Sequence, residues 1–497
     1  LTQISKANVK DLVPVWNLSL DSSTNASTQP LIANGVMYVA THNATVAIDA
    51  VTGRQKWKTM IELPADINGY LCCGIHTRGL AIADGVIYRT TIDAHVVAIN
   101  AADGKELWKS KAADYKQGYS MTHAPLVANG ILITGISGGE YGTRGFLKGW
   151  DLKTGKELWT RYTTAAPDEK GGDSWNKDTY LKGGAPTWIT GSYDPDLDLV
   201  YWGTGNGGPW NAAARGKDTL YVCSVLAIKP KTGEIAWYFQ FSPGDPYDYD
   251  SVNELVVADL KVQGKTTKTL IQANRNGFFY VLDRVTGKFQ FGLPFAKVNW
   301  ASGLDEKGRP IQTPQPPGGV TFPGQQGGTN WWSPAYSPRT GLFYVGAWEN
   351  VSGVFTSAPA EYRPGANFMG GNFRASRPAP DAPVSPNIGR PPINNWTDAE
   401  SHGAILALDP NTGERKWTFP LYDLTESGLM TTASDLVFTG SRDGYLMALD
   451  ARTGALVWKI NLSSAQMRSA PISYMVDGKQ YITYVTGNVL MAFGLRD

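Results

Sequence analysis

An acidic segment at residues 243–255 holds the densest group of side chains able to do chemistry in this sequence. It reads P-G-D-P-Y-D-Y-D-S-V-N-E-L and places carboxylates at Asp245, Asp248 and Asp250. Carboxylates at this spacing can form a solvated acidic turn, or they can supply hard oxygen ligands and a general base. The segment is therefore a candidate site whose chemistry depends on what the fold brings beside it.

Three further segments carry single polar side chains in settings that suit a ligand. Glu140 lies in the glycine-rich run G-I-S-G-G-E-Y-G-T-R-G, and Asn206 lies in Y-W-G-T-G-N-G-G-P-W-N. Glycine lets a backbone come close to a ligand, although each run alone is also typical of a polar turn. Arg275 opens the apolar stretch N-R-N-G-F-F-Y-V-L-D, where it is either a surface residue or a buried donor paired to oxygens.

The sequence has three cysteines, and two of them, Cys72 and Cys73, are adjacent while Cys223 stands alone. A disulfide between neighbours closes an eight-membered ring and strains the peptide, and such strain usually marks a functional site. Two reduced, buried thiols are the alternative. No C-x-x-C pair occurs, which excludes a zinc site of that kind and a C-x-x-C-H haem attachment site.

A repeat that runs through the chain must position these segments. Seven copies share a small residue, an apolar residue, a turn containing Gly and a closing aromatic, and they end at Trp57, Trp108, Trp159, Trp237, Phe291, Trp417 and Trp458. Alternating apolar residues around a turn of the D-x-x-T-G kind predict a β-hairpin. A second hairpin precedes most copies, so each unit is expected to be a four-stranded blade. The repeated Trp is expected to fill the gap between neighbouring blades.

An eighth unit is split between the two ends of the chain. Residues 489–495 resemble the third strand of a blade with no turn after it, and residues 13–18 resemble a fourth strand with no hairpin before it. Pairing of these N- and C-terminal strands would close a ring. We therefore predict an all-β fold, an eight-bladed β-propeller with tryptophan-docking repeats, as a single domain over residues 1–497. An open array of Trp-rich hairpins is the alternative.

The spacing of the turn glycines shows where chain has been added. Gly53, Gly104 and Gly155 follow one another at intervals of 51, whereas 126 residues separate Gly287 from Gly413. The longer interval contains an inserted Pro/Gly-rich loop at about 358–392, with too few periodic apolar residues for a domain. We interpret it as a lid or rim over one end of the propeller axis. A partner-binding surface and a disordered segment are the alternatives.

Charge and hydropathy exclude two classes of partner. The 45 Lys and Arg residues against 44 Asp and Glu give a formal net charge of +1, and no basic run is interleaved with aromatics, so no nucleic-acid surface is expected. No stretch approaches the roughly 18 unbroken apolar residues of a membrane helix, so no membrane span is expected. The chain begins at Leu1 without signal-peptide features, as expected of a cytosolic protein or of one whose signal peptide has been removed.

Together, the polar segments resemble the pyrroloquinoline quinone (PQQ)-dependent alcohol dehydrogenases, the quinoprotein family of methanol and ethanol dehydrogenases. The resemblance covers essentially the whole chain: the Trp-docking repeats, the adjacent cysteines before R-G-L, S-G-x-E-x-G-x-R-G, G-x-G-N-x-x-P-W-N and the acidic segment ending in N-E-L occur in the family's order. It implies an enzyme that oxidises a primary or secondary alcohol, with an aldehyde or polyol as further options, by hydride transfer to metal-activated PQQ.

The resemblance also implies which residues hold the cofactor. A disulfide between Cys72 and Cys73 would cover one face of the quinone ring and Trp188 the other, since a flat conjugated ring is held by stacking. Charge-assisted hydrogen bonds suit the three carboxylates of the cofactor. The other cofactor-contacting positions implied by the family pattern are Arg78, Thr122, Ser137, Arg144, Asn330 and Trp331.

By the same resemblance, Asp248 is the catalytic base and Arg275 stabilises negative charge on the quinone oxygens. The implied metal ligands are Glu140, Asn206 and Asp248, and all-oxygen ligation suits calcium. Asp250 matches an additional aspartate of the lanthanide-using branch of the family. A lanthanide ion is therefore predicted to support activity, with Ca²⁺ also allowed and a solvated Asp250 as the alternative.

The resemblance extends to partners and surroundings. Because no C-x-x-C-H motif provides a fused haem domain, electrons would pass to a separate soluble cytochrome c. An oxidising compartment keeps a disulfide between adjacent cysteines, which favours the periplasm with the signal peptide already removed. Tyr247, Pro186 and Ser27 depart from the family pattern, at positions where Trp, Thr and a cofactor-contacting Glu are common.

Two functions of other classes remain compatible with a Trp-docking propeller. One is a noncatalytic scaffold for assembly, and the other is a sugar-binding propeller. Neither requires Cys72, Cys73, Glu140, Asn206 and Asp248 together, so their co-occurrence favours the enzyme.

Overall fold

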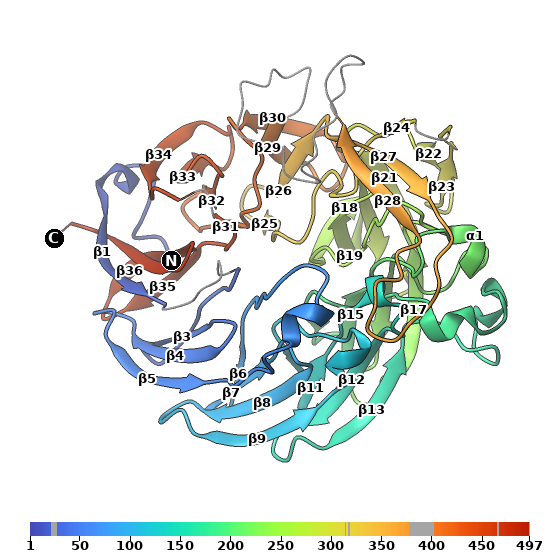
Figure 1. The fold of residues 1–497 in the computed structure, drawn as a ribbon. Helices are drawn as coiled ribbons and strands as arrows, with labels where there is room; N and C mark the ends of the chain where they lie inside the picture. The colour runs from blue at the N-terminus through green and yellow to red at the C-terminus, as the bar shows by residue number, and fades with distance from the viewer. Residues whose placement is uncertain (21–26, 314, 317–318, 377–401, 465–466, 497) are drawn as a thin grey trace.

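The structure is a computed structural model that describes residues 1–20, 27–313, 315–316, 319–376, 402–464 and 467–496. Within these residues, eight four-stranded antiparallel sheets are arranged in a ring around a common centre (Figure 1). Such radial repetition of small sheets is the architecture of a β-propeller. The all-β propeller predicted from the repeat is confirmed.

Six of the sheets are built from four consecutive strands each. They are β2–β5 (Leu31–Ala33, Val36–Ala40, Ala44–Asp49, Gln55–Met60), β6–β9 (Ala81–Ala83, Val86–Thr90, His95–Asn100, Glu106–Lys111), β10–β13 (Leu126–Ala128, Ile131–Thr134, Phe146–Asp151, Glu157–Tyr162), β14–β17 (Ser192–Asp194, Leu199–Gly203, Ser224–Ile228, Ile235–Gln240), β18–β21 (Val256–Val262, Lys265–Ala273, Phe278–Asp283, Phe289–Pro294) and β31–β34 (Leu429–Thr431, Leu436–Gly440, Tyr445–Asp450, Leu456–Asn461).

The other two sheets combine strands that are not consecutive. One contains β25 (Ala335–Ser337), β26 (Leu342–Glu349), β29 (His402–Leu408) and β30 (Arg415–Pro420), and the other contains β1 (Leu12–Ser19), β35 (Ile472–Val476), β36 (Lys479–Thr486) and β37 (Val489–Leu495). Two accessory sheets pair β22 (Ala301–Leu304) with β23 (Pro310–Gln312), and β27 (Ser352–Ser357) with β24 (Val320–Thr321) and β28 (Gly371–Ser376).

The helices of the described residues are short. They are α1 (Ala212–Arg215) and the 3₁₀ helices η1 (Val9–Asp11), η2 (Ile67–Tyr70), η3 (Tyr115–Gln117), η4 (Gly139–Tyr141), η5 (Gly172–Ser174) and η6 (Lys177–Lys182). None of these described helices has the length and apolar character needed to cross a membrane.

The repeated tryptophan joins several of the sheets to the next one along the chain. On β9, the indole N–H of Trp108 donates to the carbonyl of Leu152, in the hairpin turn of the following sheet, at 3.1 Å. The ring of Trp108 covers Gly155, where φ is +67° and a Cβ atom would lie 2.5 Å from the indole. Hydrogen bonds of the same kind run from Trp57 to Ala101, from Trp159 to Pro230 and from Trp417 to Ala451. The turn glycine is thus required both by its backbone conformation and by the tryptophan that covers it.

The two ends of the chain meet in one sheet. Strand β1 pairs antiparallel with β37, from Leu12 opposite Leu495 to Ser19 opposite Val489. In Figure 1 the blue β1 lies beside the red C-terminal strands. The strand expected at residues 13–18 therefore lies against the one expected at 489–495.

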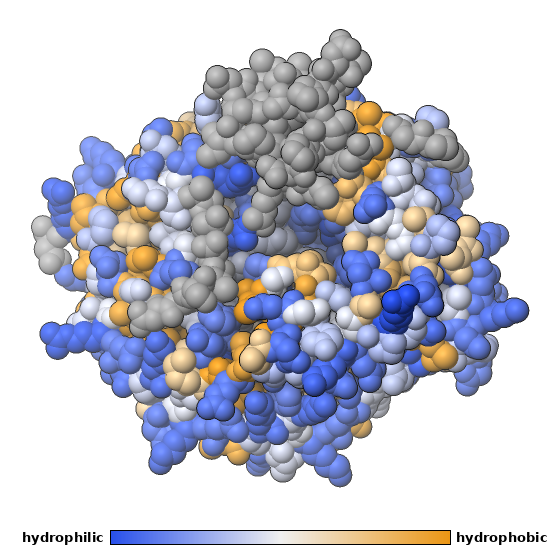
Figure 2. Space-filling model, in the orientation of Figure 1, coloured by the Kyte–Doolittle hydropathy of each residue, from blue (hydrophilic) through white to orange (hydrophobic). Residues whose placement is uncertain are grey.

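The apolar core lies between neighbouring sheets. For example, Tyr38 and Ala47 of the β2–β5 sheet pack against Ile87 and Val97 of the β6–β9 sheet, and all four are buried. Each sheet buries its two faces against its neighbours in this way, which leaves the centre of the ring to the connecting loops. Figure 2 shows one face of the ring, hollowed near its centre.

Candidate active site

The candidate residues lie on loops at one face of the propeller. In an antiparallel sheet, the loop after the second strand and the loop after the fourth strand lie at the same end. Asn206 follows β15 and Arg275 follows β19, which are second strands of their sheets. Asp248 and Asp250 follow β17, which is a fourth strand. The topology therefore collects segments that are far apart in the sequence.

Arg275 joins two of the carboxylates. Its Nη1 lies 2.6 Å from Asp250 Oδ2 and its Nη2 lies 3.2 Å from Asp248 Oδ2, while its Nε donates to the carbonyl of Gln325 at 2.9 Å. The three charged side chains are at most 5% exposed. Arg275 is therefore a buried donor paired to oxygens rather than a surface residue, and the acidic segment is not a solvated turn.

Asp250 is the most connected of the acids. Its Oδ1 accepts the backbone N–H of Asn206 at 2.5 Å, and its Oδ2 also accepts the indole N–H of Trp188 at 3.3 Å. A Cβ atom at Gly205 would lie 2.2 Å from Asp250 Oδ1, so only glycine allows this approach. Asp250 thus links the candidate metal ligand Asn206 to the candidate stacking residue Trp188.

Two oxygens beside this network have no hydrogen-bond partner among the described residues. They are Oδ1 of Asp248 and Oδ1 of Asn206, and both side chains are buried. Glu140 belongs to the same neighbourhood, because a Cβ atom on the preceding Gly139 would lie 2.5 Å from Asn206 Oδ1. Leaving a buried polar atom unpaired costs about 1 to 3 kcal/mol. A hard cation binds such oxygens directly, so these residues fit a metal ion.

The charges of the acids also favour a cation. Burial raises the pKa of Glu140 to about 7, and the charge of Asp250 adds to the rise. Burial likewise raises the pKa of Asp248 well above its ordinary value; Arg275 opposes this rise, and Asp250 and Glu140 increase it. Among the described residues, the one guanidinium forms ion pairs with Asp248 and Asp250 and none with Glu140, so a bound cation would balance the remaining negative charge.

The acids do not complete a metal site by themselves. In the part of the chain that the structure describes, no three His, Cys, Asp or Glu side chains form a metal-binding group. The amide oxygen of Asn206 and oxygens of a cofactor would have to complete the coordination of an ion held by Glu140, Asp248 and Asp250. This requirement agrees with the mixed ligand set that the sequence implies.

Arg78 lies between two aromatic rings. The centre of its guanidinium is 4.8 Å from the ring of Trp188 and 5.1 Å from the ring of Trp331. Its Nε and Nη1 are buried and have no partner among the described residues, and burial lowers the pKa of Arg78 to about 9. An anionic group would satisfy both nitrogens, so Arg78 fits a carboxylate of PQQ.

Cys72 and Cys73 form a disulfide in the structure, and both are exposed. The alternative of two reduced, buried thiols is therefore wrong. Two further predicted residues have polar groups: the Oγ of Ser137 is buried without a partner among the described residues, and the hydroxyl of Thr122 donates to the carbonyl of Trp188 at 3.4 Å. These groups can meet the edge of a flat ligand that stacks on Trp188.

Asn330 and Arg144 make contacts outside the acidic network. The Asn330 amide donates to Oε1 of Gln326 at 3.1 Å, and its Oδ1 accepts the backbone N–H of Trp331 at 2.9 Å. The guanidinium of Arg144 donates from Nε to the hydroxyl of Thr164 at 3.1 Å and lies 3.8 Å from the ring of Tyr162. The contacts of Arg144 therefore do not join it to the other candidate residues.

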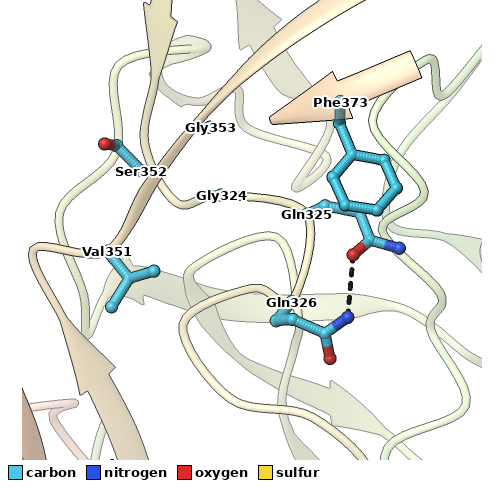
Figure 3. A pocket seen from close by; sticks show the side chains of 7 residues that line it. All are labelled: Gly324, Gln325, Gln326, Val351, Ser352, Gly353 and Phe373. Atoms are coloured by element: carbon cyan, nitrogen blue, oxygen red, sulfur yellow. Dashed lines mark hydrogen bonds between the residues drawn. The ribbon is translucent and has the colours of Figure 1, made fainter. Parts of the chain in front are cut away.

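The sequence did not point to Gln325, which is part of the site. Its side-chain amide donates to Asp248 Oδ2, and its Oε1 accepts from the amide of Gln326 at 2.7 Å. Figure 3 shows both glutamines beside a small pocket that Phe373 also lines. The run P-G-Q-Q-G-G at 323–328 is the signal that could have identified them, since it resembles the other glycine-rich polar runs.

A cavity of about 220 Å³ adjoins the candidate cofactor residues Arg78 and Trp331, which both line it. Much of its remaining wall comes from residues that precede the first strands of successive sheets, such as Leu80, Glu254 and Ala470. Burial raises the pKa of Glu254 to about 7, and Ser333 donates to its Oε1 at 3.1 Å. The cavity is therefore lined by both polar and apolar side chains and is built by many sheets at once.

Comparison with known proteins agrees with this geometry. Residues 1–312 and 421–482 match the PQQ family described as glucose/ethanol/alcohol dehydrogenase, β-propeller domain. The quinoprotein alcohol dehydrogenase PedH of Pseudomonas putida is 38% identical, with 97% of this chain and 82% of that protein aligned. A lanthanide-dependent methanol dehydrogenase of Methylacidiphilum fumariolicum is 35% identical, with 98% of this chain and 82% of that protein aligned.

Solved structures extend the similarity to three dimensions. A europium-containing methanol dehydrogenase matches with a TM-score of 0.90 at 32% identity, over 100% of this chain and 95% of that chain. The family match covers more than half of the chain, and these relatives align along nearly all of it. The chain therefore belongs to the PQQ-dependent quinoprotein alcohol dehydrogenases.

Proposed function

We propose that this enzyme oxidises an alcohol at the buried acidic network, with Asp248 as the general base. The observation that carries the proposal is the pair of buried oxygens, on Asp248 and Asn206, that lack a partner beside the Arg275 bridge. When bound, PQQ supplies the electrophilic quinone that accepts a hydride from the alcohol carbon. The remaining steps belong to side chains of this chain.

Asp248 is suited to hold the hydroxyl proton of the substrate. Its Oδ2 accepts hydrogen bonds from Arg275 and from the amide of Gln325, and its buried Oδ1 has no partner among the described residues, so Oδ1 is the oxygen available to a substrate hydroxyl. Its backbone has a φ of +63°, a conformation that costs energy for a residue other than glycine and is typical of functional sites. Arg275 would stabilise negative charge that develops on nearby oxygens.

A metal ion would be held by Glu140, Asn206, Asp248 and Asp250, and we propose that it is a lanthanide ion or Ca²⁺. Trivalent ions favour more anionic oxygens than calcium requires, and Asp250 provides one. The names of two relatives, a lanthanide-dependent and a europium-containing methanol dehydrogenase, support the lanthanide. Asp250 has to share its oxygens between the ion and Arg275, since both of its oxygens already accept hydrogen bonds.

PQQ would lie between the Cys72–Cys73 disulfide and the ring of Trp188. The unpaired nitrogens of Arg78 and the hydroxyl of Ser137 support this position, because they are donors without an acceptor among the described residues. The other proposed contacts are those of Thr122, Arg144, Asn330 and Trp331, and the bonds of Arg144 to Thr164 give it the weakest support among them.

We propose that the eight four-stranded sheets are eight blades of one domain over residues 1–497, closed by the pairing of β1 with β37. The inserted loop at about 358–392 would act as a lid, although residues 377–392 lie outside the described residues. Its described part supports a lid, because the backbone N–H of Phe368 donates to the carbonyl of Glu140 at 2.7 Å. A soluble cytochrome c in the periplasm is the electron acceptor that we propose.

Reconstitution tests the function. The full chain is mixed with PQQ and either Ca²⁺ or La³⁺, and dye reduction is followed with primary alcohols, secondary alcohols, polyols and aldehydes. Asp248→Asn should lower the rate constant at least about 100-fold, the contribution of a positioned base, and should leave the absorption band of bound PQQ in place. Asp178→Asn, at an exposed position, is the control.

The rival functions give different results in the same experiment. No quinone absorption band in the mixture would favour a noncatalytic scaffold. Saccharide binding without dye reduction would favour a sugar-binding propeller.

A further inference from the structure

A second buried arginine faces the cavity that Arg78 lines. Arg468 lies on the loop before β35, it is 7% exposed, and it belongs to none of the motifs that resemble the family. Its Nε lies 2.9 Å from Oε2 of Glu426, and both side chains are at most 8% exposed. This ion pair fixes the plane of the guanidinium and leaves Nη1 and Nη2 as the groups that can reach into the cavity.

The charges around the proposed cofactor call for such a residue. PQQ carries three carboxylates, and each buried carboxylate needs donors or a cation. Arg78 offers two unpaired nitrogens, whereas Arg144 is bonded through Nε and Nη2 to Thr164. Ser27 lines the same cavity as Arg468 and carries no charge that would compete for the guanidinium.

We propose that Arg468, held in place by Glu426, is a second cationic ligand of the PQQ carboxylates and a determinant of cofactor affinity. Glu426 then acts as a positioning residue, because its carboxylate contacts the guanidinium and not the cofactor. The inference depends on the proposed function, since it takes PQQ as the occupant of the site.

Glu254 lines the cavity too, and the charge of its carboxyl affects how well the cavity binds an anion. As an anion it would repel the carboxylates that Arg78 and Arg468 attract. A protonated Glu254 would instead leave both arginines free to pair with the ligand. With Glu254 protonated, the charged groups that line the cavity are the two arginines, and their positive charge suits the binding of an anion.

Binding measurements on the full chain separate the roles. PQQ and its trimethyl ester, which lacks the three negative charges, are titrated in the presence of Ca²⁺, and quenching of tryptophan fluorescence gives the dissociation constants. Arg468→Gln should weaken PQQ binding about tenfold or more, the value of one charge-assisted hydrogen bond, and should change binding of the ester much less. Glu426→Gln should weaken PQQ binding to a smaller extent.

Two variants control for packing. Arg442→Gln removes another largely buried arginine, which pairs with Asp423 at 3.5 Å and is not among the residues that line the cavity, and it should bind PQQ like the unmodified chain. The double variant Glu426→Gln/Arg468→Gln avoids a buried unpaired carboxylate, so it should fold even where Arg468→Gln does not, and it should show the same loss of PQQ affinity.

Three outcomes would overturn the proposal. Unchanged PQQ affinity in Arg468→Gln and in the double variant would remove Arg468 from the site. Equal loss of affinity for PQQ and for the ester would assign Arg468 a structural role. Failure of the unmodified chain to bind PQQ would overturn the proposed function, and this inference with it, and that failure is recognised before any variant is made.

Discussion

At the scale of single residues, the buried charges explain why the proposed site suits a cation. Asp248, Asp250 and Glu140 are brought together with one paired arginine, Arg275, and burial raises the pKa of all three acids. Two arrangements can neutralise them: protonation, or a bound ion that replaces protons with direct oxygen contacts. The unpaired oxygens of Asp248 and Asn206 favour the ion.

Asp250→Ala is expected to abolish most lanthanide-supported activity. The variant removes one anionic oxygen ligand, and it also leaves Arg275 paired with Asp248 alone. We expect a loss of about tenfold or more in affinity for Tb³⁺, measured by luminescence on the full chain with PQQ, and a parallel loss of dye reduction with La³⁺. Asp250→Asn keeps the size of the side chain and isolates the effect of charge. Full lanthanide activity in Asp250→Ala would contradict the proposed ligand set.

Glu254 should make stability depend on pH between about 4.5 and 7. Burial raises its pKa in the folded chain to about 7 from an ordinary 4.5, so folding favours the protonated form. The contribution of Glu254 to the free energy of unfolding is fully present at pH values below the ordinary pKa of 4.5. It is lost as the pH rises through about 7. Melting temperatures of Glu254→Gln should therefore fall less than those of the unmodified chain over this range.

The hydrogen bond that Ser333 donates to Glu254 favours the anion and opposes the effect of burial, and Arg78 and Arg468 are the charged residues that line the same cavity. Glu62→Gln, at an exposed position, is the matched control and should follow the unmodified chain. If the melting temperatures of Glu254→Gln and of the unmodified chain changed equally with pH, the pKa of Glu254 would be the same in the folded and unfolded chain, and the prediction would be wrong.

The site was predictable from the sequence only in part. Asp248, Asp250, Asn206 and Arg275 stand in motifs, and the structure joins them by hydrogen bonds. Gln325, Glu254 and Arg468 are polar residues of loops that no local motif marks. Their position near the candidate site becomes visible only in the fold, where the ring brings their loops together. Arg144 stands in a motif as well, yet Thr164 and two tyrosine rings hold its guanidinium. These contacts of Arg144 were not predictable from its motif, because Thr164 and the two tyrosines lie outside it.

At the scale of the strand and turn, the local sequence of a blade specifies its hairpin turn. The D-x-x-T-G turn forms because the Asp side chain accepts backbone N–H groups of the turn, as Asp151 Oδ1 does from Lys153 at 3.1 Å and Thr154 at 2.8 Å. Gly155 then supplies the positive φ, and Trp108 of the preceding sheet covers it. These contacts are local or join adjacent repeats, so the sequence pattern predicts them well.

Trp108→Phe should lower the free energy of unfolding by roughly 1 kcal/mol, because it removes the hydrogen bond to Leu152 and keeps most of the apolar area. Gly155→Ala should cost more, since it places a Cβ atom 2.5 Å from the indole at a φ of +67°. Chemical denaturation measures both effects. Leu107→Ala, on the exposed side of the same strand, is the control. If it lowered the free energy of unfolding as much as Gly155→Ala does, the result would argue against a specific contribution from Trp108 packing on Gly155.

At the scale of the whole molecule, the pairing of β1 with β37 completes a four-stranded sheet from the two ends of the chain. With β1 in place, the sheet of β35–β37 has four strands like the others. Without β1, the hydrogen-bonding edge of β37 is exposed, and exposed edges favour aggregation. The order of strands in this sheet was predictable because both ends of the chain lack the partner strand that each internal repeat contains.

Deletion of residues 1–19 should therefore lower the melting temperature and increase aggregation. Differential scanning calorimetry and light scattering at several protein concentrations measure the two effects. Deletion of Leu1 and Thr2 alone removes no strand residue and serves as the control. A melting temperature unchanged by the longer deletion would mean that β1 contributes nothing to the ring.

The meeting of the two ends has a consequence for biosynthesis. The 220 Å³ cavity draws its wall from Ser27 near the start of the chain and from Ala470 near its finish, and the hydroxyl of Ser469 donates to the carbonyl of Thr28 at 2.7 Å. A ribosome-bound intermediate that lacks the last thirty or so residues has no such cavity, whatever its first sheets have achieved. Binding of a prosthetic group in this cavity would therefore require the segments around Ser27 and Ala470 to be synthesised and brought together first.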